Sequence, residues 1–443
     1  MDRIRHVLHW LRGRLWIIPA VMSALALALA YLLLFSGIVP TGQDGAQFWW
    51  LFSGDPGTAR DLLSTLLAGM ITMTSLVVSI TIVVLSLAAA QLGPRLIWNF
   101  VRDRQIQCVI GLFIATILYI LVVLRSITGD LGTPHVAITV ASALAIGCLF
   151  ALLFHVNKLA RSIISDTMVN DVAESLDQAI TRLPMESNSQ ERERLPRPDH
   201  RLRRALELTR SGYVQLVDYS SLCALASRHD LLITLNIRPG QFALRGSEYG
   251  ALHASAPVED DVIYRAGQAI VLGLERTPTQ DIEYSIRQLV EVSVRALSPG
   301  INDPFTAVAV INRLAAALAS LANRCVRETH LRDNAGVVRV VAPAVDYSGL
   351  VDAAFHQIRQ SAHSQVRVLI ELARRLTELS FLVNTDRAAP IFRHLQILFR
   401  VTSTLPEVED RRALERIIVP TLARASGGEI RADSPILAHF RGD

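Results

Sequence analysis

The hydrophobic residues of the chain are concentrated in four long uncharged runs near its beginning. These runs occupy about residues 15–36, 62–91, 107–124 and 136–156. Each is close to the roughly 20 residues that a helix needs to cross the apolar core of a bilayer. The pattern therefore predicts four membrane-spanning helices in a transmembrane domain of residues 1–160. The second run is longer than the bilayer requires, which a tilted helix accommodates.

Charges beside these runs predict how the chain is oriented. Arginines precede the first run and separate the second from the third, and Lys158 and Arg161 follow the fourth. The loops at 37–61 and 125–135 together hold two arginines against four aspartates. Because cytoplasmic loops retain positive charge, we expect a multi-pass protein of a bacterial inner membrane with both termini in the cytoplasm. The five tryptophans lie at or near the predicted span ends, where such rings favour the interface.

Hydroxyl side chains form a stripe along the second run. At about 100° per residue, five of them project within about 80° of one another: Thr65, Thr72, Ser75, Ser79 and Ser86. Small residues in such stripes commonly let helices pack closely. Alternatively, the same helix from several subunits surrounds a narrow polar path lined by these pore-lining candidates. No acidic or basic residue lies in the middle of a run, which argues against a proton-coupled pump.

The remaining two-thirds of the chain has the composition of a cytoplasmic domain. The pattern of residues 161–203 predicts an amphipathic helix to about Leu183, followed by a polar linker. Short β runs then predict a small β module at 204–275, and its sequence resembles the barrel-sandwich modules of biotinyl and lipoyl domains. Those modules carry a modified lysine. Since Lys158 is the only lysine of the chain, we expect a structural or docking module and no carrier function.

Residues 276–443 are predicted to be mainly helical, with one β run at Val337–Val341. Pro420 is expected to bend or end the last helix. The predicted helices lie at about 279–297, 304–323, 347–382, 387–402 and 407–424. The expected fold class is thus an all-α four-helix transmembrane domain joined to a cytoplasmic α+β region, consisting of a small β-barrel or sandwich module and a helical domain.

The loop Ser298–Pro304 is the strongest candidate for a binding site. Asp303 followed by Pro304 predicts a capped helix start. A helix N-terminus beside arginines can hold an anion, if the two flanking helices pair as a hairpin. A purely structural role is favoured, because Asp303 competes with an anion for the same amides. The candidate residues are Arg276, Thr277, Gln280, Asp281, Arg295, Ser298, Gly300, Asn302 and Asp303.

Composition and motif searches narrow the function classes. The net charge of +4 is small for 443 residues, so nucleic acid is not an expected partner. Four scattered cysteines suggest neither a disulfide framework nor a metal site. The chain contains no H-E-x-x-H, paired C-x-x-C, dinucleotide or G-x-S-x-G motif. We therefore predict no catalytic residue, no metal and no cofactor.

Several segments together resemble a bacterial family of multi-pass membrane proteins catalogued as a domain of unknown function. They are "MTSLVVSITIVVLSLAAAQLGPRL" in the second run, "RPGQFALRG" in the β module, and "RTPTQDIEYSIRQLVEVSVRALSPGINDPFTA" in the helical region. The resemblance covers most of the chain and supports the four-span layout. It implies no substrate, cofactor or catalytic residue.

Three hypotheses for the function follow. The leading one is an oligomeric pore or channel-like transporter for an ion or small anion, with the second spans lining the path and the cytoplasmic domain assembling or gating it. Its partners are the bilayer and further copies of the chain. The alternative is a membrane-anchored sensor or scaffold that binds an anionic ligand or a protein. A membrane-bound enzyme is third.

Overall fold

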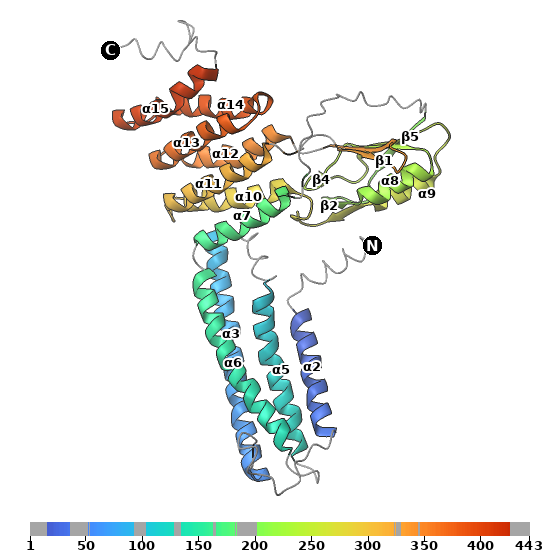
Figure 1. Ribbon diagram of the computed structural model, residues 1–443, viewed down its shortest axis with the longest axis vertical. Helices are drawn as coiled ribbons and strands as arrows, with labels where there is room; N and C mark the ends of the chain where they lie inside the picture. Colours follow the sequence, from blue (N-terminus) through green and yellow to red (C-terminus); the bar gives the residue numbers. More distant parts are fainter. Residues whose placement is uncertain are drawn as a thin grey trace. The chain divides into compact units, whose positions relative to one another are not determined.

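Two compact units make up the chain, Met1–Ser165 and Asp166–Asp443 (Figure 1). The computed structural model describes residues 16–35, 52, 54–92, 103–127, 134–162, 165–181, 183, 202–322, 324, 329–343 and 346–425. The predicted polar linker up to Arg201 lies outside these residues, apart from Leu183.

The described residues of unit 1 form long apolar helices at the predicted hydrophobic runs. They are α2 (Ile17–Phe35), α3 (Pro56–Leu92), α5 (Arg104–Ser126) and α6 (His135–Ser162). α5 packs against each of the other three helices. Its large side chains Phe113, Tyr119 and Ile120 are fully buried in the core of the unit. All four helices are long and apolar enough to cross a membrane.

The helix α3 is longer than its hydrophobic run. It begins at Pro56 and has 37 residues, which gives a length of about 55 Å at 1.5 Å per residue. The apolar core of a bilayer is only about 30 Å thick. α3 therefore has room to tilt, or to continue beyond the apolar core at one or both ends.

Unit 2 begins with helix α7 (Ser165–Thr181), which is amphipathic as predicted and buries Val172 and Leu176. The region predicted as a β module follows, and it contributes strands to two sheets together with two helices. Its elements are β1 (Leu202–Glu207), β2 (Gly212–Val217), α8 (Tyr219–Arg228), β3 (Leu232–Leu235), β4 (Phe242–Ala243), β5 (Glu248–Ala254), α9 (Asp260–Gln268) and β6 (Ile270–Gly273).

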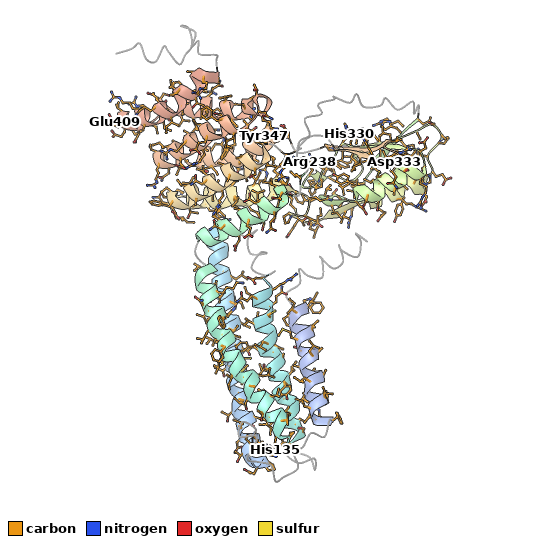
Figure 2. The ribbon with its side chains drawn as sticks, viewed as in Figure 1. His135, Arg238, His330, Asp333, Tyr347 and Glu409 are labelled. Carbon is orange, nitrogen blue, oxygen red and sulfur yellow. The ribbon has the colours of Figure 1, made fainter. Side chains whose placement is uncertain are left out.

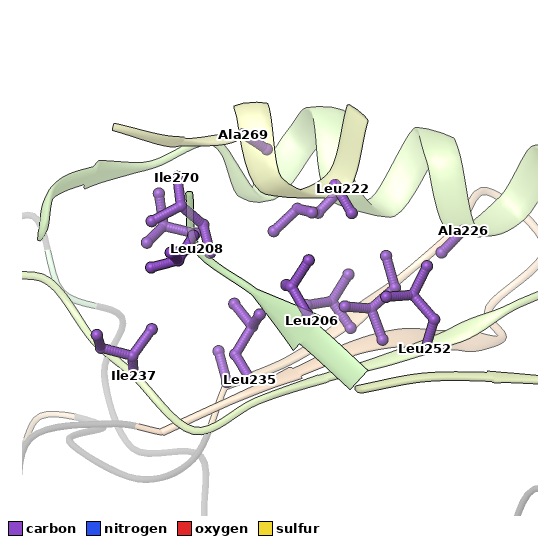
Figure 3. Close-up of a cluster of buried hydrophobic side chains, with 14 of the residues drawn as sticks. Leu206, Leu208, Leu222, Ala226, Leu235, Ile237, Leu252, Ala269 and Ile270 are labelled. Carbon is purple, nitrogen blue, oxygen red and sulfur yellow. The ribbon is translucent and has the colours of Figure 1, made fainter. Parts of the chain in front are cut away.

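The two sheets do not follow chain order. The smaller sheet has the order β4-β2-β6, and the larger has the order β1-β5-β3-β8-β7. Strands β7 (Thr329–Arg332) and β8 (Val338–Ala342) come from the helical region, and β8 pairs with β3 in parallel, Ile233 opposite Val340. The β runs predicted in this region and the run at Val337–Val341 correspond to strands, whereas β1, β5, β7, α8 and α9 were not predicted. Figure 3 shows the shared core, where Leu222 and Ala226 of α8 face Leu206 and Leu252 of the larger sheet.

The helical region consists of α10 (Ile282–Ala296), α11 (Pro304–Leu321), α12 (Tyr347–Ser361), α13 (Val366–Leu382), α14 (Thr385–Thr402) and α15 (Val408–Ala425). The predicted helix 347–382 is thus two helices separated by a short turn, in which Gln365 N–H donates to the Ala362 carbonyl. Of the two effects expected of Pro420, ending the helix does not occur, because Pro420 lies inside α15, which continues to Ala425.

Candidate functional site

All five hydroxyl residues of the stripe on α3 are exposed in the single chain: Thr65, Thr72, Ser75, Ser79 and Ser86. Three of their hydroxyls donate to the carbonyl four residues earlier, Thr65 to Asp61 at 2.8 Å, Thr72 to Ala68 at 3.0 Å and Ser86 to Ile82 at 2.9 Å. These hydroxyls therefore have partners within the helix, while their oxygens still present weakly polar groups outward.

The stripe lies opposite the face by which α3 packs into its own unit. Ala59, Leu63, Met70 and Val77 are buried in the unit's core. At about 100° per residue, the centre of this buried face and the centre of the stripe are about 180° apart. Among the described residues of unit 1, the stripe therefore lies outside the packed core.

The inward face of α3 holds a different polar contact. Thr81 donates its hydroxyl proton to the Val77 carbonyl, so its oxygen accepts from His155 Nε2 of α6 at 3.0 Å. His155 is buried, with 1% of its surface exposed, which indicates a packing role. Nearby on the same helix, Lys158 forms an ion pair with Asp103, the N-cap of α5.

Asp303 caps α11 as the sequence predicted. Its Oδ1 accepts from the backbone N–H of Phe305 at 3.0 Å and of Thr306 at 3.2 Å, and the Thr306 hydroxyl donates to Oδ2. Asn302 adopts a left-handed φ of 50° and accepts from the Gln365 side chain at 2.7 Å. The amides that an anion would use are thus already bound, which supports the structural interpretation of this loop.

The rest of the loop is held by backbone contacts. Ser298 donates its hydroxyl proton to the Arg295 carbonyl at 2.6 Å, while its own carbonyl accepts from Asn302 N–H at 2.9 Å. Arg295 pairs with Glu291 of its own helix at 3.5 Å. Gly300 is exposed and has open space beside it.

Arg276 and Asp281 lie at the opposite end of α10 from this loop. α10 has 15 residues, so its two ends are about 22 Å apart. The α10–α11 hairpin forms as expected, but the idea that Arg276, Thr277, Gln280 and Asp281 reach the loop was wrong. An antiparallel pair brings the start of its first helix near the end of its second, far from the connecting loop.

These four residues instead join α10 to the β4-β2-β6 sheet. Gln280 accepts from Val217 N–H at 2.9 Å and donates to the Val217 carbonyl at 3.2 Å, and Thr277 donates to the Gln215 carbonyl at 3.5 Å. Asp281 caps α10 and receives two hydrogen bonds from Arg276, at 2.6 and 2.9 Å.

Electrostatics at this joint combine burial with ion pairs. Asp281 is 2% exposed; burial raises its pKa, and the guanidinium of Arg276 opposes that rise. Beside it, Arg238, labelled in Figure 2, donates to Glu283 at 3.0 Å, and Arg287 donates to the same carboxylate at 2.7 Å. Burial raises the pKa of Glu283, but these two arginines outweigh it, so the pKa lies below its usual value.

A cavity of about 430 Å³ lies between β1 and α9, away from every predicted site residue. Its lining is mixed, with Arg204 and Glu207 beside the apolar side chains of Leu208 and Ile263. Arg204 spans part of it to reach Asp260 at 2.7 Å, an exposed ion pair of little energetic weight. No signal in the sequence indicated this cavity.

Comparison with known proteins identifies the family. Residues 12–378 match the family described as "Predicted membrane protein (DUF2254)". The chain belongs to this family. It is 29% identical over 439 residues to uncharacterised proteins of Mycobacterium tuberculosis and Mycobacterium bovis, an alignment that covers 96% of this chain and 82% of the relatives. No solved structure matches the chain. The family and the apolar helices together support a membrane protein.

Proposed function

We propose that the chain is one subunit of an oligomeric membrane pore in which α3 of each copy faces a central axis. The observation that carries this proposal is the exposed hydroxyl stripe, about 180° from the face of α3 that packs into the unit. In a bilayer, hydroxyl side chains gain more from a partner helix or a hydrated path than from lipid tails. The proposed assembly supplies both.

The proposed topology has four spans, with both termini in the cytoplasm. A fifth helix, α11, also has the length and composition of a span. It is packed against α10, α12 and α13 of unit 2. These neighbouring helices carry charged side chains that the apolar core of a bilayer would not accommodate, so we place α11 in the cytoplasmic region. The orientation rests on the basic residues that flank the apolar runs.

A path lined by this stripe would be neutral and weakly polar. The stripe contains hydroxyls but no charged side chain, so a permeating species would retain part of its hydration while hydroxyl oxygens and protons replace the rest. The proposed cargo is an ion or small anion. The proposal requires no catalytic residue, and unit 2 is assigned an assembly or gating role.

Cysteine cross-linking tests the assembly. In a background in which the four native cysteines are replaced, Ser79→Cys places a thiol on the stripe, and Val78→Cys places one about 100° away. Both positions are exposed in the single chain. We expect copies of Ser79→Cys to cross-link in lipid, and Val78→Cys, facing lipid, to remain uncross-linked. Equal cross-linking at both positions, or a monomer in mild detergent, would contradict a ring around the stripe.

Flux measurements separate a pore from mere packing between copies. Ser79→Leu is expected to reduce ion flux into proteoliposomes without dissociating the oligomer, because it adds an apolar side chain to the path. Intact oligomers that conduct nothing before and after this substitution would favour the alternative of a membrane-anchored sensor or scaffold.

A further inference from the structure

Helices α12 and α14 lie side by side in a parallel register (Figure 1). Asp352 of α12 accepts from Arg393 at 2.6 and 2.7 Å, and from His394 Nε2 at 2.9 Å. The ring of His394 also contacts the ring of His356, at 6.4 Å between centroids. Residues further along α12 thus contact residues at a similar or later position in α14. The two helices therefore run in the same direction, with Asp352 beside Arg393.

Two helical turns further along, the same register places two arginines opposite each other. Arg359 lies seven residues after Asp352, and Arg400 lies seven residues after Arg393, so each shares the face of the earlier residue. The first position is an aspartate–arginine pair, whereas the second is an arginine–arginine pair. Among the described residues, no acidic side chain pairs with either Arg359 or Arg400. The register therefore brings two guanidinium groups together without a described carboxylate beside either.

Unpartnered polar atoms support the same conclusion. The Nε of Arg359 is buried and has no hydrogen-bond partner among the described residues. His394 is 1% exposed, and its Nδ1 is likewise buried without a partner. A buried donor or acceptor without a partner destabilises the folded state. Both atoms belong to side chains of the α12–α14 pair, and a small polar ligand between these helices would supply the partners that they lack.

The charges act on each other across this contact. Burial, followed by the nearby charge of Arg400, lowers the pKa of Arg359. Burial also lowers the pKa of His394, and the charges of Arg359 and Arg393 add to this effect against the carboxylate of Asp352. His394 is thus held neutral. Its Nε2 proton is committed to Asp352, so its Nδ1 carries a lone pair that requires a donor.

We propose that Arg359, Arg400 and His394 form a binding site for a phosphate monoanion or phosphomonoester between α12 and α14. The two guanidinium groups donate to the charged phosphate oxygens. A protonated phosphate oxygen donates to His394 Nδ1. This combination requires a ligand with both charged oxygens and an O–H group. Inorganic phosphate has both near neutral pH, a phosphomonoester has both in its monoanion, which predominates below its second pKa of about 6, and sulfate lacks the O–H group.

A simpler explanation would assign both arginines to their own helix ends. Arg359 and Arg400 lie in the last turns of α12 and α14, where cations interact favourably with the helix dipole. That arrangement normally includes hydrogen bonds to the last free carbonyls. Neither arginine makes such a bond among the described residues, and the explanation leaves His394 Nδ1 without a donor.

Binding of radiolabelled inorganic phosphate to the full-length protein in detergent tests the site. We expect saturable binding to the wild type. Arg359→Gln and Arg400→Gln should each weaken it by about tenfold or more, the weight of one charge-assisted hydrogen bond. Arg416→Gln, an exposed arginine on α15, is the charge-matched control and should bind like the wild type. Absent binding, or equal binding in all four proteins, would overturn the proposal.

Stability without phosphate gives an independent reading. Removing one of two repelling charges should raise the thermal midpoint of Arg400→Gln above the wild type in phosphate-free buffer, and phosphate should then fail to stabilise this variant. A lower midpoint in phosphate-free buffer would contradict the proposed repulsion. Sulfate that competes as well as phosphate would contradict the assignment of a donor to His394.

Nanodiscs distinguish the source of the phosphate group. Phosphatidic acid carries a phosphomonoester headgroup, whereas phosphatidylglycerol carries a diester without the O–H group. Competition with labelled phosphate by phosphatidic acid alone would identify a lipid headgroup as a ligand. Unchanged phosphate binding in both kinds of nanodisc would identify the free anion. The site goes beyond the proposed pore, and its failure would leave the cross-linking result on α3 unaffected.

Discussion

The joint between the β4-β2-β6 sheet and α10 depends on a glycine at position 240. Gly240 has a φ of +89°, and a Cβ added there would lie only 2.1 Å from Oδ2 of the buried Asp281. Gly240→Ala therefore carries two costs. The backbone strain of a side chain at positive φ is of order 1–3 kcal/mol. Displacing Asp281 from Arg276 adds the cost of disturbing a buried ion pair, for a total of roughly 3–5 kcal/mol.

Gly246→Ala is the matched control, because Gly246 has a similar φ of +77° but open space around it. This substitution introduces the backbone strain alone, so we expect the free energy of unfolding to fall by roughly 1 kcal/mol. Circular dichroism melts of the full-length protein in detergent should show a midpoint for Gly240→Ala several degrees below that of Gly246→Ala. Hydrogen exchange should also speed up at the first turn of α10. Equal midpoints for the two variants would refute the assignment of Asp281 to a tightly packed joint.

Three further predictions concern unit 2. Asp303→Ala should cost about 1–2 kcal/mol of unfolding free energy through the lost cap of α11, whereas Asp303→Asn should retain most of it in denaturant titrations. Arg387→Ala should lower the free energy of unfolding by about 3 kcal/mol, because the buried guanidinium donates to the carbonyls at positions 321, 322 and 324. Arg387→Lys should recover part of this loss. A thermal melt of Arg387→Ala like that of the wild type would contradict this role. The lowered pKa of Glu283 means that its stabilisation is present above the unfolded pKa of about 4.5 and is lost as pH falls through the folded value; Glu283→Gln should flatten the acid side of the stability profile, and an unchanged profile would refute this.

Features set by local sequence were predicted well. The apolar helices follow from run length, and the Asp303 cap follows from two adjacent residues whose geometry is fixed within one turn. The stripe on α3 follows from helical periodicity, although its exposure required the structure. Each of these features depends on residues that lie close together in the sequence.

Features set by distant contacts were not predicted. β8 enters the sheet beside β3 across about a hundred residues, and no local pattern encodes that pairing. Arg276 and Arg295 were grouped because they flank one helix, yet the length of α10 separates them. The proposed α12–α14 site could not be predicted, because it combines residues of two helices. The sequence does not show that Asp352 and Arg359 lie opposite Arg393 and Arg400. The one available signal was that Asp352 and Arg359, seven residues apart on one helix face, carry opposite charges.

A cryo-EM map of the protein in lipid nanodiscs tests the proposed pore most directly. If α3 lines a path, several copies will be related by rotational symmetry, with Ser75, Ser79 and Ser86 facing the central axis. A monomer, or an oligomer in which this stripe faces lipid, would contradict the proposed function.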